Sequence, residues 1–137
     1  MLKSIVSSPY VNMLQTALGA SALRQQVISD NIANVNTPGF KRSEVSFENR
    51  LNEVLEASKK PSVIVRTHEK HFPVRINTNI SPEINTITQT SLRVDGNNVD
   101  IDAEMAEMAK NNIYYNALVQ KTQSYFSNLK NVISGGR

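Results

Sequence analysis

Two segments carry side chains that could bind a metal ion, and neither has the spacing that such a site requires. His68 and His71 are three positions apart, whereas the helical zinc-protease signature places its histidines four apart so that both rings face one ion. The acidic run from Asp95 has Val99 where a calcium loop needs its fifth ligand, and Ala106 where it needs a bidentate glutamate. We interpret these segments as loop histidines and as a turn followed by a helix cap, so no metal or cofactor is expected.

The residues needed for catalysis are also not found in a usable arrangement. The chain has no cysteine, which excludes thiol nucleophiles and cysteine zinc sites, and its five glycines form no phosphate-binding loop. Serines are plentiful, but none is predicted to share a rigid turn with a histidine base. The sequence therefore predicts that the protein is not an enzyme.

The charge pattern and the lengths of the apolar runs argue against a nucleic acid partner, a membrane span and a cleavable export signal. The formal net charge is +3, but the cations on the expected helices form no stripe of the kind that binds nucleic acid. No apolar run approaches the roughly 18 residues that cross a bilayer. The first 18 residues lack the continuous apolar stretch of a cleavable export signal. We expect no nucleic acid partner, no direct membrane insertion and no cleavable signal peptide.

Three asparagines, Asn31, Asn34 and Asn36, are a stronger candidate for a functional role. Asparagine is a poor helix residue because its amide competes for backbone hydrogen bonds. One interpretation is a helix that frays before Pro38. The other is a buried polar layer in which the amides link neighbouring helices and fix their register. The sequence leaves both open.

The asparagines lie near the end of a long helix that heptad spacing predicts over residues 11–35, inside an N-terminal region of residues 1–37. Pro38 and Gly39 then fit the centre of a type II turn. Between Ser4 and Pro38 only Arg24 and Asp30 are charged, so this helix should be buried on more than one side. The positions that follow the spacing are Val11, Leu14, Leu18, Ser21, Gln25, Ile28, Ile32 and Val35.

A second long helix is predicted in residues 101–137. Asp100 or Asp102 can cap its start, and Gly135 with Gly136 can end it. One stripe of this helix would form the coiled-coil contact with the first helix, and Asn112 and Thr122 would fix the register between the helices. The stripe is Ile101, Met105, Met108, Asn112, Tyr115, Val119, Thr122, Phe126, Leu129 and Ile133.

The central segment, residues 38–100, contains most of the charged side chains and is expected to face solvent. Residues 47–60 have helical spacing, whereas residues 61–67 and 73–94 are expected to be strands or mobile loop. The predicted fold is mainly α, with two long terminal helices in an antiparallel coiled coil and a short helix plus extended chain between them.

Residues 28–41, ISDNIANVNTPGFK, resemble the N-terminal signature of the bacterial flagellar rod and hook family of axial proteins. Residues 95–105, 115–120 and 129–133 are similar to the proximal rod type within that family. The resemblance implies a structural rod subunit of the flagellar basal body, exported to the periplasm by the flagellar type III apparatus. It implies partners among copies of itself, other rod proteins, the basal-body adaptor protein and the export apparatus.

On this reading the two helices polymerise helically to form the drive shaft and the wall of its export channel. The alternative is a cytoplasmic coiled-coil adaptor or chaperone-like module, in which the same helices would form a small closed oligomer. The predicted assembly contacts are Leu14, Leu18, Ile28, Asn31, Ile32, Asn34, Val35, Asn36, Pro38, Gly39, Phe40, Met105, Met108, Asn112, Tyr115, Val119, Phe126, Leu129 and Ile133.

Overall fold

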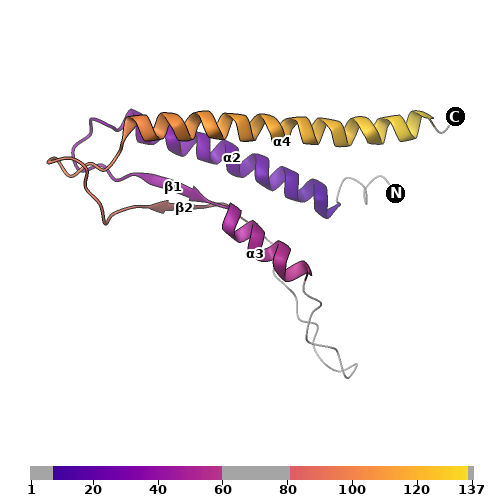
Figure 1. The fold of residues 1–137 in the computed structure, drawn as a ribbon, viewed down its shortest axis with the longest axis horizontal. Coiled ribbons are helices and arrows are strands. Elements are labelled where there is room, and N and C mark those ends of the chain that lie inside the picture. The colour runs from indigo at the N-terminus through magenta and orange to yellow at the C-terminus, as the bar shows by residue number, and fades with distance from the viewer. Residues whose placement is uncertain (1–7, 60–80, 136–137) are drawn as a thin grey trace, which may run out of the picture.

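Two long helices dominate the computed structural model, which describes residues 8–59 and 81–135. Helix α2 spans Pro9–Ala33 and helix α4 spans Ile101–Gly135. They lie side by side and run in opposite directions (Figure 1). The prediction of a mainly helical chain with two long terminal helices is confirmed.

Local chemistry explains where α2 begins and ends. The Ser8 hydroxyl caps the helix by accepting a hydrogen bond of 3.3 Å from the Val11 amide, and Pro9 occupies the first turn. The helix ends at Ala33, two residues before the predicted end, because Asn34 adopts a capping conformation. The predicted type II turn is confirmed: the Phe40 amide donates to the Thr37 carbonyl and Gly39 has φ +72°.

A short helix and a small sheet connect the long helices. Helix α3 spans Glu48–Lys59, close to the predicted range. Strand β1 (Ser43–Ser46) pairs antiparallel with β2 (Glu83–Thr86), so that Ser43 lies opposite Thr86. Strand β2 falls in the stretch expected to be extended, whereas β1 was not predicted. Residues 87–94 of that stretch form bends and turns, whereas residues 73–80, the segment 61–67 and the two histidines lie outside the described residues.

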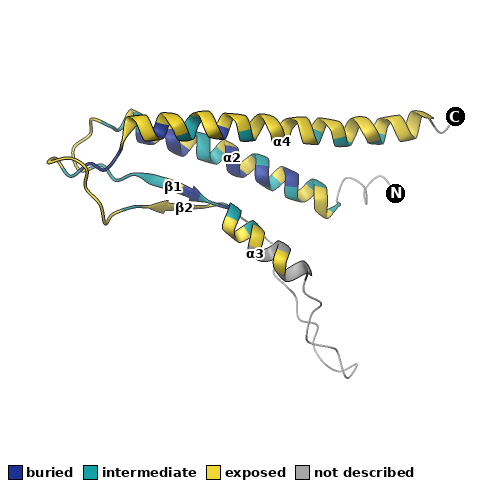
Figure 2. Cartoon of the chain, in the orientation of Figure 1, coloured by how far each residue is buried: buried dark blue, intermediate teal, exposed yellow. Residues whose placement is uncertain are grey.

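Helix α2 is the centre of the molecule because it is covered on two sides. Figure 2 shows buried positions along α2, while α4 is mostly exposed. Small residues on α2, Ala17 and Ala20, let the Phe47 ring approach until it is only 1% exposed, and Leu118 of α4 packs against the same cluster. The core is therefore a thin layer on either side of one helix.

The expectation that the central segment faces solvent is wrong for two of its parts. Val45 in β1, Phe47 just after it and Val99 before α4 are core residues, each less than 7% exposed. For Phe47 the cause is the small side chains of Ala17 and Ala20 on α2, which leave room for its ring. Hydrogen bonds from Gly39 to Asp95 and from Asn31 to Glu104 join the two signature segments of the sequence.

Helix α4 is rotated by about one residue from the predicted orientation. Its buried positions are Glu104 and Asn111, followed along the same face by half-buried Leu118. The neighbouring predicted positions, Met105, Asn112, Tyr115, Val119, Phe126 and Ile133, are exposed within the chain. Their predicted packing against the first helix of the same chain is wrong, because hydrogen bonds of Glu104 and Asn111 fix the rotation of α4.

The predicted face of α2 is closer to the one observed. Leu14 and Ile28 are buried, and Val11, Leu18, Ile32 and Val35 are half-buried. None of the described helices combines the length and apolar character needed to cross a membrane.

Candidate functional site

A buried polar cluster joins α2, β1 and α4 at one end of the helical pair. The Asn31 amide donates to the Ser43 carbonyl at 2.7 Å and to the Glu104 carboxylate at 3.1 Å, and its oxygen accepts from the Ser43 amide at 3.0 Å. The second Glu104 oxygen accepts from Arg42 Nε. Glu104 is 0% exposed, so this pairing is what makes its burial tolerable.

The charges on either side of Glu104 reinforce the cluster. Burial lowers the pKa of the Arg42 guanidinium, but hydrogen bonds and Coulomb attraction to Glu104 and Glu44 outweigh this effect, and the net pKa is raised. Arg42 therefore stays cationic at every pH at which the protein folds. The polar-layer interpretation of Asn31 is confirmed within the chain, where it links two helices and a strand.

A second asparagine, Asn111, fixes α4 against the middle of α2. Its oxygen accepts from the Ser21 hydroxyl at 2.9 Å, and its amide donates to the Ser21 carbonyl and the Gln25 side chain, each at 3.0 Å. The heptad spacing predicted this register role for Asn112, which is exposed. Thr122 also makes no bond to α2, since its hydroxyl donates to the Leu118 carbonyl of its own helix.

Two more asparagines hold the loop that precedes α4. The Asn97 amide donates to the carbonyls of Asn34, Val35 and Thr37 at 3.0, 3.1 and 2.9 Å. It thus supplies a donor to carbonyl groups that follow the end of α2. Asn98 accepts from the Arg42 amide at 2.6 Å. Sequence reasoning identified only a turn here, because nothing in the local spacing indicates a partner about sixty residues earlier.

The other residues of the N-terminal signature lie at the surface around this cluster. Asn34 is half-buried and donates to the Asp30 carbonyl of its own helix at 2.8 Å. Asn36, Pro38 and Gly39 are exposed, and Phe40 is half-buried. The turn is nevertheless attached to the rest of the fold, since the Gly39 amide donates to the Asp95 carbonyl at 2.9 Å.

The acidic run that resembles a calcium loop acts as a turn and a cap. Asp95 accepts from the Asn97 amide at 3.1 Å, and Asp100 accepts from the Asp102 and Ala103 amides at 3.0 and 3.4 Å. Asp100 is therefore the N-cap of α4, one of the two predicted caps. In residues 8–59 and 81–135 no group of three or more potential ligands is placed to hold a metal ion.

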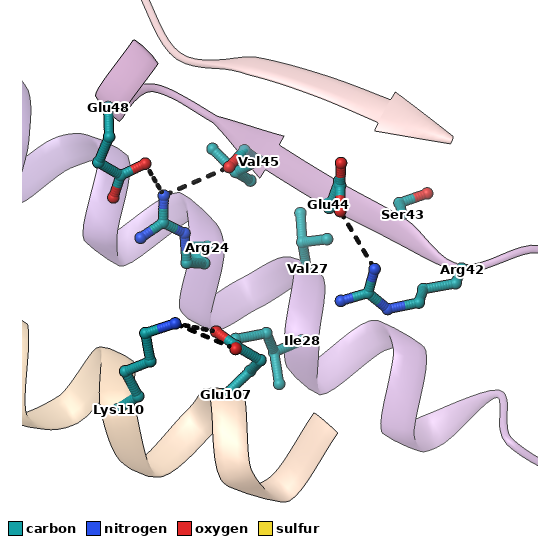
Figure 3. Close-up of a pocket in the computed structure, with 10 residues that line it drawn as sticks. All are labelled: Arg24, Val27, Ile28, Arg42, Ser43, Glu44, Val45, Glu48, Glu107 and Lys110. Carbon is teal, nitrogen blue, oxygen red and sulfur yellow. Dashed lines mark hydrogen bonds and ion pairs between the residues drawn. The ribbon is translucent and has the colours of Figure 1, made fainter. Parts of the chain in front are cut away.

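A cavity of about 420 Å³ lies between α2, β1 and the first turns of α4 (Figure 3). Arg24 pairs with Glu48 at 2.6 Å, and Lys110 pairs with Glu107 at 3.2 Å. The hydrogen bond from Arg24 lowers the pKa of Glu48, and the same bond raises the pKa of Arg24. Each charged side chain in the lining is in an ion pair, and Val27 and Ile28 contribute apolar surface.

The outstanding surface feature is an apolar stripe along α4 that the rest of the described chain leaves open. We call it the α4 stripe and define it by side chains that are 39–62% exposed. Because they span most of α4, the stripe is roughly 48 Å long at 1.5 Å per residue. Exposed apolar side chains that recur along one side of a helix are typical of an interaction site. Its members are Ile101, Met105, Tyr115, Val119, Phe126 and Ile133.

Comparisons with known proteins agree with a structural role. The sequence model of a family described as Flagella basal body rod protein matches residues 12–41. The chain is 38% identical to the flagellar basal body rod protein FlgB of Bacillus subtilis over 127 residues, covering 93% of this chain and 95% of the relative. It is 34% identical to FlgB of Borreliella burgdorferi over 120 residues, covering 85% and 89% of the two chains. FlgB of Escherichia coli is 29% identical over 125 residues, covering 89% of this chain and 91% of the relative.

Proposed function

This chain belongs to the FlgB family of flagellar basal body rod proteins, and on that premise we propose that it is a structural subunit of the proximal rod. The family is structural and is not enzymatic. In this proposal the two long helices polymerise helically, and their packing among neighbouring subunits forms the drive shaft and the wall of the export channel.

The observation that carries the proposal is the exposure of the α4 stripe. A single chain gains nothing from keeping Met105, Val119 and Phe126 in one line at its surface, because apolar burial is the main favourable term in folding. Half-exposed side chains of this size each stabilise an assembly by about 1 kcal/mol when a neighbour covers them. A coiled-coil contact with a neighbouring subunit uses the heptad spacing that the stripe already has.

The remaining predicted contacts divide into two groups under this proposal. Leu14, Ile28 and Asn31 are buried within the chain, so they would support the interface from beneath. Asn36, Pro38, Gly39 and Asn112 are exposed and would contact neighbours directly, with Phe40, Asn34 and Val35 beside them. Leu18, Ile32, Met108 and Leu129 are half-buried and would lie at the edges of the contact.

The proposed partners and location follow from the family. We propose contacts with other copies of the chain, with other rod proteins, with the basal-body adaptor protein and with the flagellar type III export apparatus. That apparatus would deliver the chain to the periplasm.

Complementation tests the proposal. The chain is expressed in a flagellated bacterium that lacks its own rod protein of this family, and basal bodies are isolated. We expect the chain in the rod fraction and restored swimming. A chain that stays in the cytoplasm as a stable closed dimer or tetramer by sedimentation would contradict the proposal and favour the adaptor alternative.

A further inference from the structure

We infer that the α4 stripe of one subunit packs on the outward-facing side of α2 in a second copy, so that subunits join head to tail. The inference rests on the proposed function only in assuming that copies of this chain assemble. Beyond the proposed function, the inference names the two surfaces that meet between subunits. Three observations on α2 and α4 support it.

The first observation is the composition of the side of α2 that faces away from α4 and β1. We call this side the outer face of α2. Its residues are all exposed, recur at intervals of three and four, and are uncharged; on the same side of α2, Asp30 near the C-terminal end is the exposed charged residue. An ordinary solvent face of a helix is charged. The members are Asn12, Gln15, Gly19, Ala22, Gln26, Ser29 and Ala33.

The second observation concerns Gly19, in the interior of α2. A Cβ placed on Gly19 would meet nothing within 4 Å, so no contact within the described chain requires a glycine here. Its backbone does not require one either, since the described glycines with positive φ are Gly39 and Gly96. Glycine weakens a helix relative to alanine. A glycine at such a position leaves room for a neighbouring helix to approach closely.

The third observation is the match between the two surfaces. The α4 stripe presents large apolar side chains, whereas the outer face of α2 presents short or uncharged ones, so packing of the stripe on the outer face from Asn12 to Gln26 buries no charge. Asp30 lies beyond this part, near the end of α2. The stripe is also continuous with the α2 contact inside the chain, because half-buried Met108 and Leu129 lie between the two. A helix with two adjacent heptad stripes can pack between two partner helices.

The pairing has a consequence for the form of the assembly. Stripe and outer face are different surfaces of the same chain, so each subunit offers one and accepts the other. Such a heterologous contact generates rings or open helical polymers, whereas a contact of stripe with stripe would close a dimer.

Substitutions at Gly19 test the acceptor surface. Gly19→Ala should raise the melting temperature of the purified chain by roughly 2–5 °C, because it improves the helix. Gly19→Leu should leave the chain folded and exported but should lower its recovery in basal bodies at least about tenfold, by blocking close approach. Ala117→Leu adds a similar side chain to exposed α4 away from the stripe and should assemble normally. Wild-type recovery of the Gly19→Leu variant would overturn the inference.

Cross-linking tests the pairing itself, and the absence of cysteine gives a clean background. Ala22→Cys is co-expressed with single cysteines at Met105, Asn112, Val119, Phe126 or Ile133, which are about 10.5 Å apart. A bismaleimide of that length can therefore join Ala22→Cys to at least one of these positions, whatever the axial register between α2 and α4 of the two subunits. We expect heterotypic dimers in isolated basal bodies and no dimers from either variant alone.

The outcomes separate the inference from the proposed function. Basal bodies that contain both variants without heterotypic dimers overturn the inference and leave the rod function standing. Dimers from Val119→Cys alone also overturn it, in favour of contact between stripes. A wild-type chain that does not enter basal bodies overturns both.

Discussion

The Asn31 amide on α2 donates a hydrogen bond of 3.1 Å to the buried Glu104 carboxylate on α4, across 73 positions of sequence. This bond decides how α4 is rotated. With Glu104 turned toward α2, the next residue, Met105, is turned outward and is 53% exposed. A polar contact inside the chain thus leaves the apolar stripe free for another subunit.

Replacing Asn31 should destabilise the fold strongly. Asn31→Ala removes both bonds to Ser43 and one donor to Glu104, which stays buried. We expect a loss of about 2–4 kcal/mol in the free energy of unfolding, measured by urea denaturation. Asn36→Ala is the matched control, because Asn36 is exposed, and it should change stability by less than about 0.5 kcal/mol. Equal effects would show that Asn31 does not hold the two helices together.

The neighbours Asn111 and Asn112 should respond differently to the same change. Asn111→Ala removes three hydrogen bonds to α2 and should cost about 1–3 kcal/mol. Asn112→Ala replaces an exposed side chain and should be neutral or slightly stabilising, since alanine is the better helix former. Thermal unfolding followed by circular dichroism compares the two. A larger loss at Asn112 would mean that α4 has the orientation expected from the heptad pattern.

Leu118 and Val119 separate folding from assembly. Leu118 packs on the core cluster of Ala17, Ala20 and Phe47, so Leu118→Asp should cost roughly 3 kcal/mol of folding stability. Val119 is 39% exposed on the α4 stripe, so Val119→Asp should fold within about 0.5 kcal/mol of wild type.

In cells, the Val119→Asp variant should be exported but should be missing from isolated basal bodies, because a carboxylate in the stripe would be buried without a partner. Lys121→Asp is the control, since Lys121 is exposed on another side of α4. Normal rods from Val119→Asp would show that the stripe does not face a neighbour.

Both long helices could be predicted from the sequence because apolar residues recur at intervals of three and four positions over many turns. It could not fix the rotation of α4, since a stripe through Glu104 and Asn111 follows the same spacing as one through Met105 and Asn112. The choice depends on partners such as Asn31 and Ser21, which are 73 and 90 positions away from Glu104 and Asn111. Their pairing is a property of the folded chain.

Strand β1 was missed for a related reason. Its four residues, SEVS, include one apolar side chain, so they give no strand pattern. The strand exists because its backbone is held on both sides. The Asn31 side chain bonds Ser43 on one edge, and β2 pairs with the other. The asparagine pattern suggested a buried polar layer, but its strand partner could not be predicted from spacing.

The Arg24 and Glu48 pair should make stability depend on pH in the acid range. The hydrogen bond from Arg24 lowers the pKa of Glu48 in the folded chain. A lowered folded pKa stabilises the fold fully above the unfolded pKa, and this contribution is lost as the pH falls through the folded value. Because Glu48 is 46% exposed, the effect should stay below about 1 kcal/mol.

Glu48→Gln removes the titration and keeps the side-chain size. The stability difference between wild type and this variant should therefore be constant above about pH 5 and should shrink toward pH 3. Chemical denaturation at several pH values measures it. A difference that grows on acidification would have the wrong sign for this pair.

Amide hydrogen exchange should show that α4 is not equally stable along its length in the isolated chain. Near its start, Glu104 and Asn111 are buried against α2, and farther along Tyr10 and Tyr125 pack with ring centroids 5.5 Å apart. Beyond this ring contact, Val132 and Ile133 are 74% and 62% exposed. We expect amides of residues 126–133 to exchange at least about tenfold faster than those of residues 104–118.

Assembly should remove this difference, because a neighbouring subunit that covers the α4 stripe also covers the end of the helix. Exchange on the purified chain and on isolated rods, read by mass spectrometry, makes the comparison. The Val119→Asp chain should keep the fast-exchanging end under every condition, since it should not assemble. Strong protection of residues 126–133 in the isolated wild-type chain would place their partner within the same molecule and contradict a role for the α4 end in subunit contact.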